Sequence, residues 1–203
     1  MNPLDIEKRS MEIIESELQV SLPEEIKPIV KRVIHATADF SFAETLRFTP
    51  GVISLIRGML LAGASIVTDT NMALAGISKP ALKKLNVKAM CFMADEDTAK
   101  EAKKRGQTRA YISMERALEL PGSKLLVCGN APTFLFPLLE MPVTPRDIAV
   151  IGVPVGFVNV VEAKERLWLS GIPCIAAMGR RGGSNVAAAI VNALLYGIPG
   201  VRS

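Results

Sequence analysis

Short, nearly continuous apolar runs recur along the chain, each bordered by turn-forming residues. Five such runs span residues 64–69, 87–92, 124–129, 148–153 and 173–178. A strand with one face in water alternates apolar and polar positions, whereas a strand buried on both faces stays apolar throughout. The runs therefore predict five strands of a parallel sheet that is covered on both faces.

Segments with helical spacing of apolar residues separate these runs. They span residues 52–62, 95–105, 113–119, 133–140, 158–170 and 184–196. Two further helices are predicted before the first run, one from Pro3 and one from Ser21, where Ser21 and Glu24 have the spacing of a capping box. Alternating strands and helices predict a parallel sheet between helical layers. We expect one α/β domain over residues 1–203, a three-layer α/β/α sandwich with extra N-terminal helices.

The residues that follow each predicted strand are candidates for function. In open parallel sheets the ligand lies outside the carboxyl ends of the strands. The segments at that edge are 68–70, 95–97, 129–133, 154–157 and 179–184. Most of them carry glycine or polar residues suited to close backbone approach. We therefore expect these loops to line one ligand cleft.

Two of these loops have the chemistry of an anion or ligand site. The first is Gly-Arg-Arg-Gly-Gly-Ser at 179–184, which combines arginine forks with the start of a helix. It lacks the spacing and lysine of a phosphate-binding Walker loop. The second is Gly-Asn-Ala-Pro-Thr at 129–133, where Asn130 and Thr133 could bond a ligand. A solvated turn and simple helix capping remain the alternatives.

A third loop, 152–158, ends the fourth run and leads to Glu162 and Lys164. Gly156 permits close backbone contact, and Phe157 could stack on a flat ligand. A core phenylalanine at a strand end is the better interpretation from these residues alone.

His35 is the single histidine and ends the second predicted helix. Histidine is the usual proton donor or acceptor near neutral pH. From this residue alone, a structural histidine at a helix end is the simpler interpretation. A serine hydrolase is disfavoured because no Gly-x-Ser-x-Gly elbow is present.

Composition narrows the class of protein. The 203 residues carry a net charge of +4, which is too weak to indicate nucleic acid but suits a small polyanionic ligand. Three scattered cysteines in apolar runs indicate reduced core thiols, and one histidine excludes a histidine-rich metal site. The charge-free stretch 182–201 contains serine, asparagine, glycine and proline, so we expect a buried helix and no membrane contact. The expected location is the cytoplasm.

Seven segments, in order, resemble the precorrin-8X methylmutase family, also called cobalt-precorrin-8 methylmutase, of cobalamin biosynthesis. They are IEKRS (6–10), IHATADFSFAETLRFTP (34–50), AGASIVTDTNMALAGI (62–77), GQTRA (106–110), CGNAPTFLFPLLE (128–140), IGVPVGFV (151–158) and GRRGGSNVAAAIVNALL (179–195). Each segment alone is weak evidence, but their order and spacing together are specific. The family commonly has small residues after the sixth segment, where this chain has Asn159, Val160 and Val161.

The resemblance implies a fold, an assembly and a reaction. The fold is flavodoxin-like with a five-stranded parallel sheet, and the assembly is a homodimer. The enzyme is an isomerase that moves a methyl group between adjacent carbons of the corrinoid macrocycle. Precorrin-8X or cobalt-precorrin-8 would give hydrogenobyrinate or cobyrinate, and no cofactor is consumed.

The resemblance also implies site residues. His35 matches the family histidine that is proposed to protonate the ring system, while Arg109 and Ser10 match ligand contacts. Further substrate contacts are expected at Arg47, Thr68, Asp69, Met72, Asn130, Thr133, Gly156, Glu162, Lys164, Arg180, Gly183 and Ser184. No metal ligands are expected. A macrocycle rimmed by carboxylates suits arginines and helix N-termini.

Two other functions remain as alternatives. The first is a corrinoid-binding or carrier protein that holds its ligand without turnover. The second is a flavin or nucleotide binder, which the absence of a dinucleotide fingerprint and the 5% aromatic content disfavour.

Overall fold

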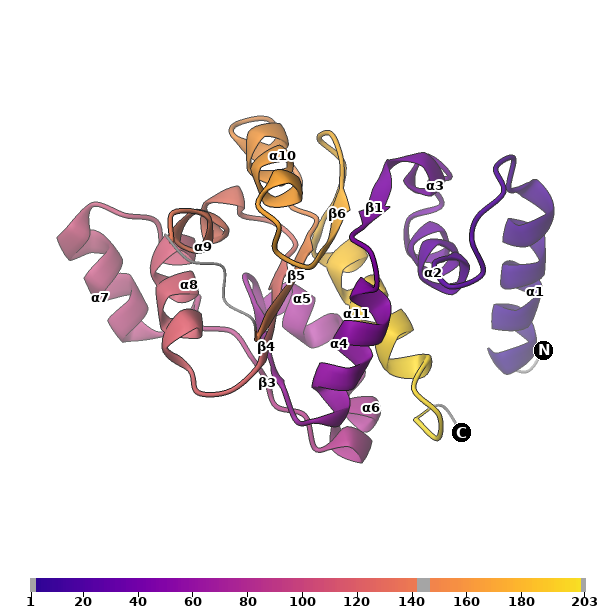
Figure 1. The fold of residues 1–203 in the computed structure, drawn as a ribbon, viewed down its shortest axis with the longest axis horizontal. Coiled ribbons are helices and arrows are strands. Elements are labelled where there is room, and N and C mark those ends of the chain that lie inside the picture. Colours follow the sequence, from indigo (N-terminus) through magenta and orange to yellow (C-terminus); the bar gives the residue numbers. More distant parts are fainter. Residues whose placement is uncertain (1–2, 142–146, 202–203) are drawn as a thin grey trace.

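One mixed sheet forms the centre of the computed structural model, which describes residues 3–141 and 147–201 (Figure 1). Among the described residues the sheet has six strands, in the order β1-β6-β5-β4-β2-β3. They are β1 (Leu46–Phe48), β2 (Ser65–Thr68), β3 (Ala89–Met90), β4 (Lys124–Cys128), β5 (Ile148–Gly152) and β6 (Cys174–Ala177). Strands β2 to β6 are parallel and lie within the five predicted runs.

Strand β1 makes the predicted five-stranded, all-parallel sheet wrong in two respects. It adds a sixth strand, and it pairs antiparallel with β6, with Arg47 opposite Ala176. Three residues, one of them an exposed arginine, are too few to show a strand period in the sequence. The strand forms because β6 is otherwise an edge with unpaired backbone groups.

Helices cover both faces of the sheet, in the layers that the sequence predicts. In chain order they are α1 (Pro3–Glu17), α2 (Lys27–Thr37), α3 (Phe42–Thr45), α4 (Val52–Leu61), α5 (Asn71–Gly76), α6 (Lys79–Leu85), α7 (Glu96–Arg105), α8 (Arg109–Glu119), the 3₁₀ turn η1 (Pro132–Phe134), α9 (Phe136–Leu139), α10 (Val160–Leu169) and α11 (Ser184–Tyr196). None of these helices is long and apolar enough to cross a bilayer.

Alternate residues of the strands enter two separate cores. In β4, Leu125 and Val127 pack with α2, α4 and α11, whereas Leu126 and Cys128 pack with α8, α9 and α10. This is the period-two geometry of a strand with two buried faces. The runs are apolar throughout because both faces of the strands are buried, as the sequence predicted.

The N-terminal helices stack outward from the first core. Helix α2 packs on α11, and α1 packs on α2 at the end of the molecule opposite α7 (Figure 1). Arg32 of α2 joins these layers, because its guanidinium lies 2.6 Å from Glu7 and 5.2 Å from the ring of Tyr196. Helix α2 begins at Lys27, not at the predicted Ser21, because Pro28 fits only the first turn of a helix.

The chain changes direction beside β2. It passes from β2 outward to β3 and then returns to β4 on the other side of β2. The carboxyl ends of β2 and β4 therefore flank the switch point at which open α/β sheets bind ligands.

Candidate functional site

The loops after β2, β4, β5 and β6 meet at the carboxyl edge of the sheet. The hydroxyls of Ser184 and Thr70 lie 2.8 Å apart, which joins the start of α11 to the start of α5. Gly129 follows β4, and a Cβ there would lie 2.9 Å from Cα of Ser184. Glycine is therefore required for this close approach, as the sequence pattern suggested. Four of the five predicted loops therefore lie together, whereas these contacts do not include residues 95–97, and a single ligand cleft lined by all five loops stays a prediction.

Asp69 holds the loop after β4 from inside the protein. It is completely buried, and its carboxylate accepts the backbone N–H groups of Gly129 at 2.9 Å, Asn130 at 2.7 Å and Ala131 at 2.8 Å. Burial raises the pKa of Asp69, although the three N–H groups act in the opposite direction. The neighbouring Thr68 is also buried and donates its hydroxyl to the carbonyl of Thr70. Both residues therefore shape the loops from beneath and do not face solvent.

Lys164 has the corresponding role beneath the loop after β6. This residue of α10 is completely buried, and its ammonium donates to the carbonyls of Gly179 at 2.8 Å and Arg181 at 2.7 Å. Burial lowers the pKa of Lys164 to about 8. Glu162, two residues earlier on the same helix, is exposed.

The two arginines of the 179–184 loop have different surroundings. Arg181 binds both carboxylate oxygens of Asp39 and the hydroxyl of Ser41. Arg180 is exposed, with its guanidinium 5.4 Å from the centre of the Phe157 ring. Phe157 itself is 83% exposed, so the interpretation of it as a core residue is wrong. An exposed aromatic ring and an exposed cation therefore lie side by side at this edge.

The contacts of Arg181 bring the end of α2 to the same edge. His35 lies exposed on the last turn of α2, four residues before Asp39. Asp39 also accepts the N–H of Ser41 in a tight turn. The residue pair Asp39 and Arg181 was not predicted from the sequence, although the acidic residue directly after a helix end was visible in Ala-Asp-Phe-Ser.

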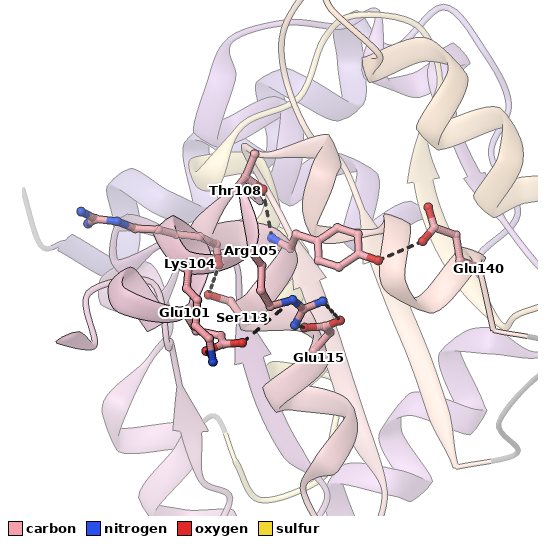
Figure 2. Close-up of polar contacts among 9 residues, drawn as sticks. Glu101, Lys104, Arg105, Thr108, Ser113, Glu115 and Glu140 are labelled. Carbon is pink, nitrogen blue, oxygen red and sulfur yellow. Dashed lines mark hydrogen bonds and ion pairs between the residues drawn. The ribbon is translucent and has the colours of Figure 1, made fainter. Parts of the chain in front are cut away.

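The loop after β4 is tied to the start of α8. Thr108 caps α8 by accepting the N–H of Tyr111, and its hydroxyl donates to Thr133 at 2.9 Å. Arg109, the next residue, is exposed beside this contact. Figure 2 shows Arg105 paired with Glu115 across the turn between α7 and α8, and Glu140, which accepts the Tyr111 hydroxyl, on the far side of α8. These contacts fix the orientation of α8.

Four other predicted substrate contacts lie at or near this edge, two with exposed side chains and two glycines with positive φ. Asn130 is exposed on the loop after β4, and Met72 is 73% exposed on α5. Gly156 has φ of +147° and donates its N–H to the carbonyl of Arg180, while Gly183 has φ of +137° and donates to Val153. These φ values favour glycine.

Two predicted contacts stand apart from the rest. Arg47 on β1 bonds the carbonyl of Glu44 through its guanidinium, at 2.5 Å. Ser10 donates to the carbonyl of Ile6 within α1, the outermost helix, whereas Arg109 begins α8 on the other side of the sheet (Figure 1). One chain therefore does not bring Ser10 and Arg109 together.

A hollow of about 600 Å³ borders this edge between the end of α1 and α3. Ser41 and Glu44 line one side of it, and Glu17 and Leu18 line the other. Ser41 also binds Arg181, so one residue lining the hollow contacts the 179–184 loop. Among the described residues no group of three or more histidine, cysteine or acidic side chains is placed to hold a metal ion.

Comparison with known proteins shows which family the chain resembles. The family model described as "Precorrin-8X methylmutase" matches residues 5–197. The chain is 43% identical to the cobalt-precorrin-8 methylmutase of Salmonella typhimurium, over 96% of this chain and 95% of that protein. It is 37% identical to the precorrin-8X methylmutase of Pseudomonas aeruginosa, over 93% of each. A solved precorrin-8X methylmutase from Thermus thermophilus superposes with a TM-score of 0.85 at 33% identity, covering 94% of this chain and 96% of that one.

Proposed function

The chain belongs to the precorrin-8X methylmutase family of isomerases, and we propose that His35 is the general acid of a methyl shift on a corrinoid macrocycle. The observation that supports this most directly is the Asp39–Arg181 contact, which ties the helix end carrying His35 to the loop carrying Arg180. A proton donor and a cation for carboxylates therefore belong to one edge.

The proposed reaction needs little covalent help from the protein. Protonation of the ring system by His35 creates an electron demand in the macrocycle. The bond from the methyl group to its first ring carbon then breaks while the bond to the adjacent carbon forms. Loss of the added proton returns the charge balance, so substrate and product are isomers. Holding the macrocycle in one geometry and supplying the proton are the main contributions expected of the protein.

Side chains, more than backbone groups, are proposed to bind the carboxylate rim. Asp69 occupies the N–H groups of residues 129–131, so these donors are not available to a substrate anion. The exposed arginines Arg109 and Arg180 supply the positive charge, and Phe157 supplies a flat apolar face. Hydrogenobyrinate or cobyrinate would be the product, according to whether the ring carries cobalt. A homodimer and a cytoplasmic location remain predictions from the family resemblance and the sequence.

Mixing the purified protein with precorrin-8X, and separately with cobalt-precorrin-8, tests this function. We expect the visible spectrum to change to that of the product when substrate is in large excess over protein. A spectral change that stops at one equivalent of ligand would contradict catalysis and indicate a carrier. Bound flavin absorbance in the purified protein would indicate the second alternative, a flavin or nucleotide binder.

A further inference from the structure

Three consecutive carbonyl groups of the 179–184 loop each accept a hydrogen bond from another part of the protein. The ammonium of Lys164 donates hydrogen bonds to the carbonyls of Gly179 at 2.8 Å and Arg181 at 2.7 Å. The carbonyl between them, that of Arg180, accepts the N–H of Gly156 at 3.2 Å. These three hydrogen bonds restrict the backbone path of residues 179–181.

The packing around this loop leaves it little freedom to adopt another path. Gly183 donates its N–H to the carbonyl of Val153 at 2.9 Å. A Cβ on Gly182 would lie 2.1 Å from the same carbonyl oxygen. The loop is therefore pressed against the end of β5 on one side and held by Lys164 on the other.

A buried lysine is a costly way to hold a surface loop. Burying an ammonium costs several kcal/mol unless its donors are satisfied. Lys164 is completely buried, and the partners of its ammonium are backbone carbonyls rather than a carboxylate. One of these carbonyls belongs to Gly179, which directly precedes Arg180, and the other belongs to Arg181. The side chains of both arginines are exposed.

We propose that Lys164 is a positioning residue for the methyl shift, which fixes the loop so that Arg180 faces the carboxylates of the macrocycle and Arg181 reaches Asp39. This inference rests on the proposed function, because the carboxylates are those of the corrinoid. Lys164 acts through the loop backbone and does not touch the substrate. This role replaces the substrate contact expected for it from the sequence.

Trypsin tests the conformational part of the proposal without any substrate. Trypsin cuts after arginine, so the bonds after Arg180 and Arg181 report how freely the loop can enter a protease. We expect Lys164→Met to be cut there at least about tenfold faster than wild type, which corresponds to the loss of about 1.4 kcal/mol. Cleavage after Lys103 on α7 is the internal control, and Lys100→Met, 72% exposed on the same helix, is the matched variant. Equal cleavage rates in Lys164→Met and wild type would overturn the proposal.

Steady-state kinetics test the functional part. Loss of a contact made equally to substrate and transition state raises KM and leaves kcat unchanged. We therefore expect Lys164→Met to raise KM about 10- to 100-fold, the range of a lost charge-assisted hydrogen bond, with kcat within about threefold. A fall in kcat at unchanged KM would contradict positioning of Arg180. Lys100→Met should match wild type in both constants.

A second variant keeps the test decisive if Lys164→Met does not fold. Lys164→Gln retains two N–H donors but ends one bond short of the ammonium. We expect cleavage after Arg180 and Arg181 at least about threefold faster than wild type, with KM raised in parallel. Wild-type behaviour of folded Lys164→Gln in both assays would overturn the proposal. Absence of methylmutase activity in the wild-type protein would instead overturn the proposed function. The trypsin assay would then still test whether Lys164 holds the 179–184 loop.

Discussion

Arg180 and Arg181 are neighbours in the chain but meet different chemistry. Arg181 is neutralised by Asp39, a pair that is partly exposed and so contributes little to stability by itself. Its importance is geometric, since it joins the end of α2 to the loop after β6. The guanidinium of Arg180 lies over the ring of Phe157, a neutral partner, so its charge is available to a ligand. One arginine therefore organises the edge and the other is available for binding.

Asp69→Asn should destabilise the protein strongly. An amide places an N–H₂ group where a carboxylate oxygen accepted a backbone N–H, so a donor faces a donor. We expect a loss of about 2–4 kcal/mol in the free energy of unfolding, measured with urea. Asp97→Asn, at a carboxylate that is 79% exposed, should change stability by less than about 0.5 kcal/mol. Equal stability of the two variants would contradict the role assigned to Asp69.

Lys164 should make stability rise with pH above neutrality. Its pKa is about 8 in the folded protein and near 10.5 in the unfolded chain. Between these values the unfolded chain holds a proton that the folded protein lacks, so folding is favoured as pH rises. Relative to Lys164→Met, wild type should gain about 2 kcal/mol between pH 7 and 9.5. The neutral amine keeps two N–H donors for its two carbonyls, so the loop remains held.

Urea unfolding of both proteins across this pH range measures that gain. Cys91 and Cys174 titrate in both proteins, so their contributions cancel in the difference, whereas the pKa of Cys128, which burial raises, is lowered by the charge of Lys164 and is part of the effect measured. A difference that stays constant or shrinks with pH would contradict a depressed pKa at Lys164.

The sequence could predict which loops matter but not which of their residues point inward. Asp69 and Lys164 are charged residues in motifs near strand ends, and exposure is the usual state of such side chains. Their burial depends on partners 60 and 15 positions away, the Gly129 amide and the Gly179 carbonyl. No local pattern carries that information. Asp39 was missed for the same reason, because its partner Arg181 is 142 positions distant.

Among elements, the long ones were predicted well and the short ones were not. Helix α11 begins at Ser184 and ends at Tyr196, as its apolar character indicated. Helices α5 and α6 were missed because segments of six and seven residues are too short to show a helical period of apolar positions. Their caps were visible, since Thr70 and Ser78 accept the N–H groups of Ala73 and Ala81, and Pro80 lies in the first turn of α6.

Two glycine substitutions should separate loop geometry from helix propensity. Gly182→Ala places a methyl group 2.1 Å from the Val153 carbonyl oxygen, so the loop must move. We expect a loss of at least about 2 kcal/mol in stability, together with weaker corrinoid binding. Gly58→Ala in α4 meets no atom within 4 Å and should add about 0.5–1 kcal/mol. Thermal unfolding and a corrinoid titration check both; a neutral Gly182→Ala would argue against the tight packing of this loop.

At the scale of the whole molecule, the predicted substrate contacts Ser10 and Arg109 are far apart within one chain. Ser10 lies on α1, the outermost helix, whereas Arg109 begins α8, which lies across the sheet from α1 (Figure 1). Val158 exposes an apolar side chain at the edge of the sheet, which a second copy would cover. The layered α/β architecture followed from the pattern of apolar residues, whereas assembly depends on surface shape, which that pattern does not encode.

We expect a homodimer in solution. Light scattering at micromolar concentration should give about twice the chain mass of 21.8 kDa. A single species at the chain mass would contradict the dimer and would leave Ser10 without a place in the site.

The most direct test of the central claim is the turnover of His35→Ala per folded molecule, measured together with its affinity for the corrinoid. His35 is exposed at the loop edge, so the substitution should leave the fold intact. General acid catalysis contributes about 10²–10⁴-fold, so turnover should fall at least about 100-fold. Affinity should stay within about tenfold, because Arg109 and Arg180 are unchanged. If the folded variant keeps more than about a tenth of wild-type turnover, His35 is not the acid.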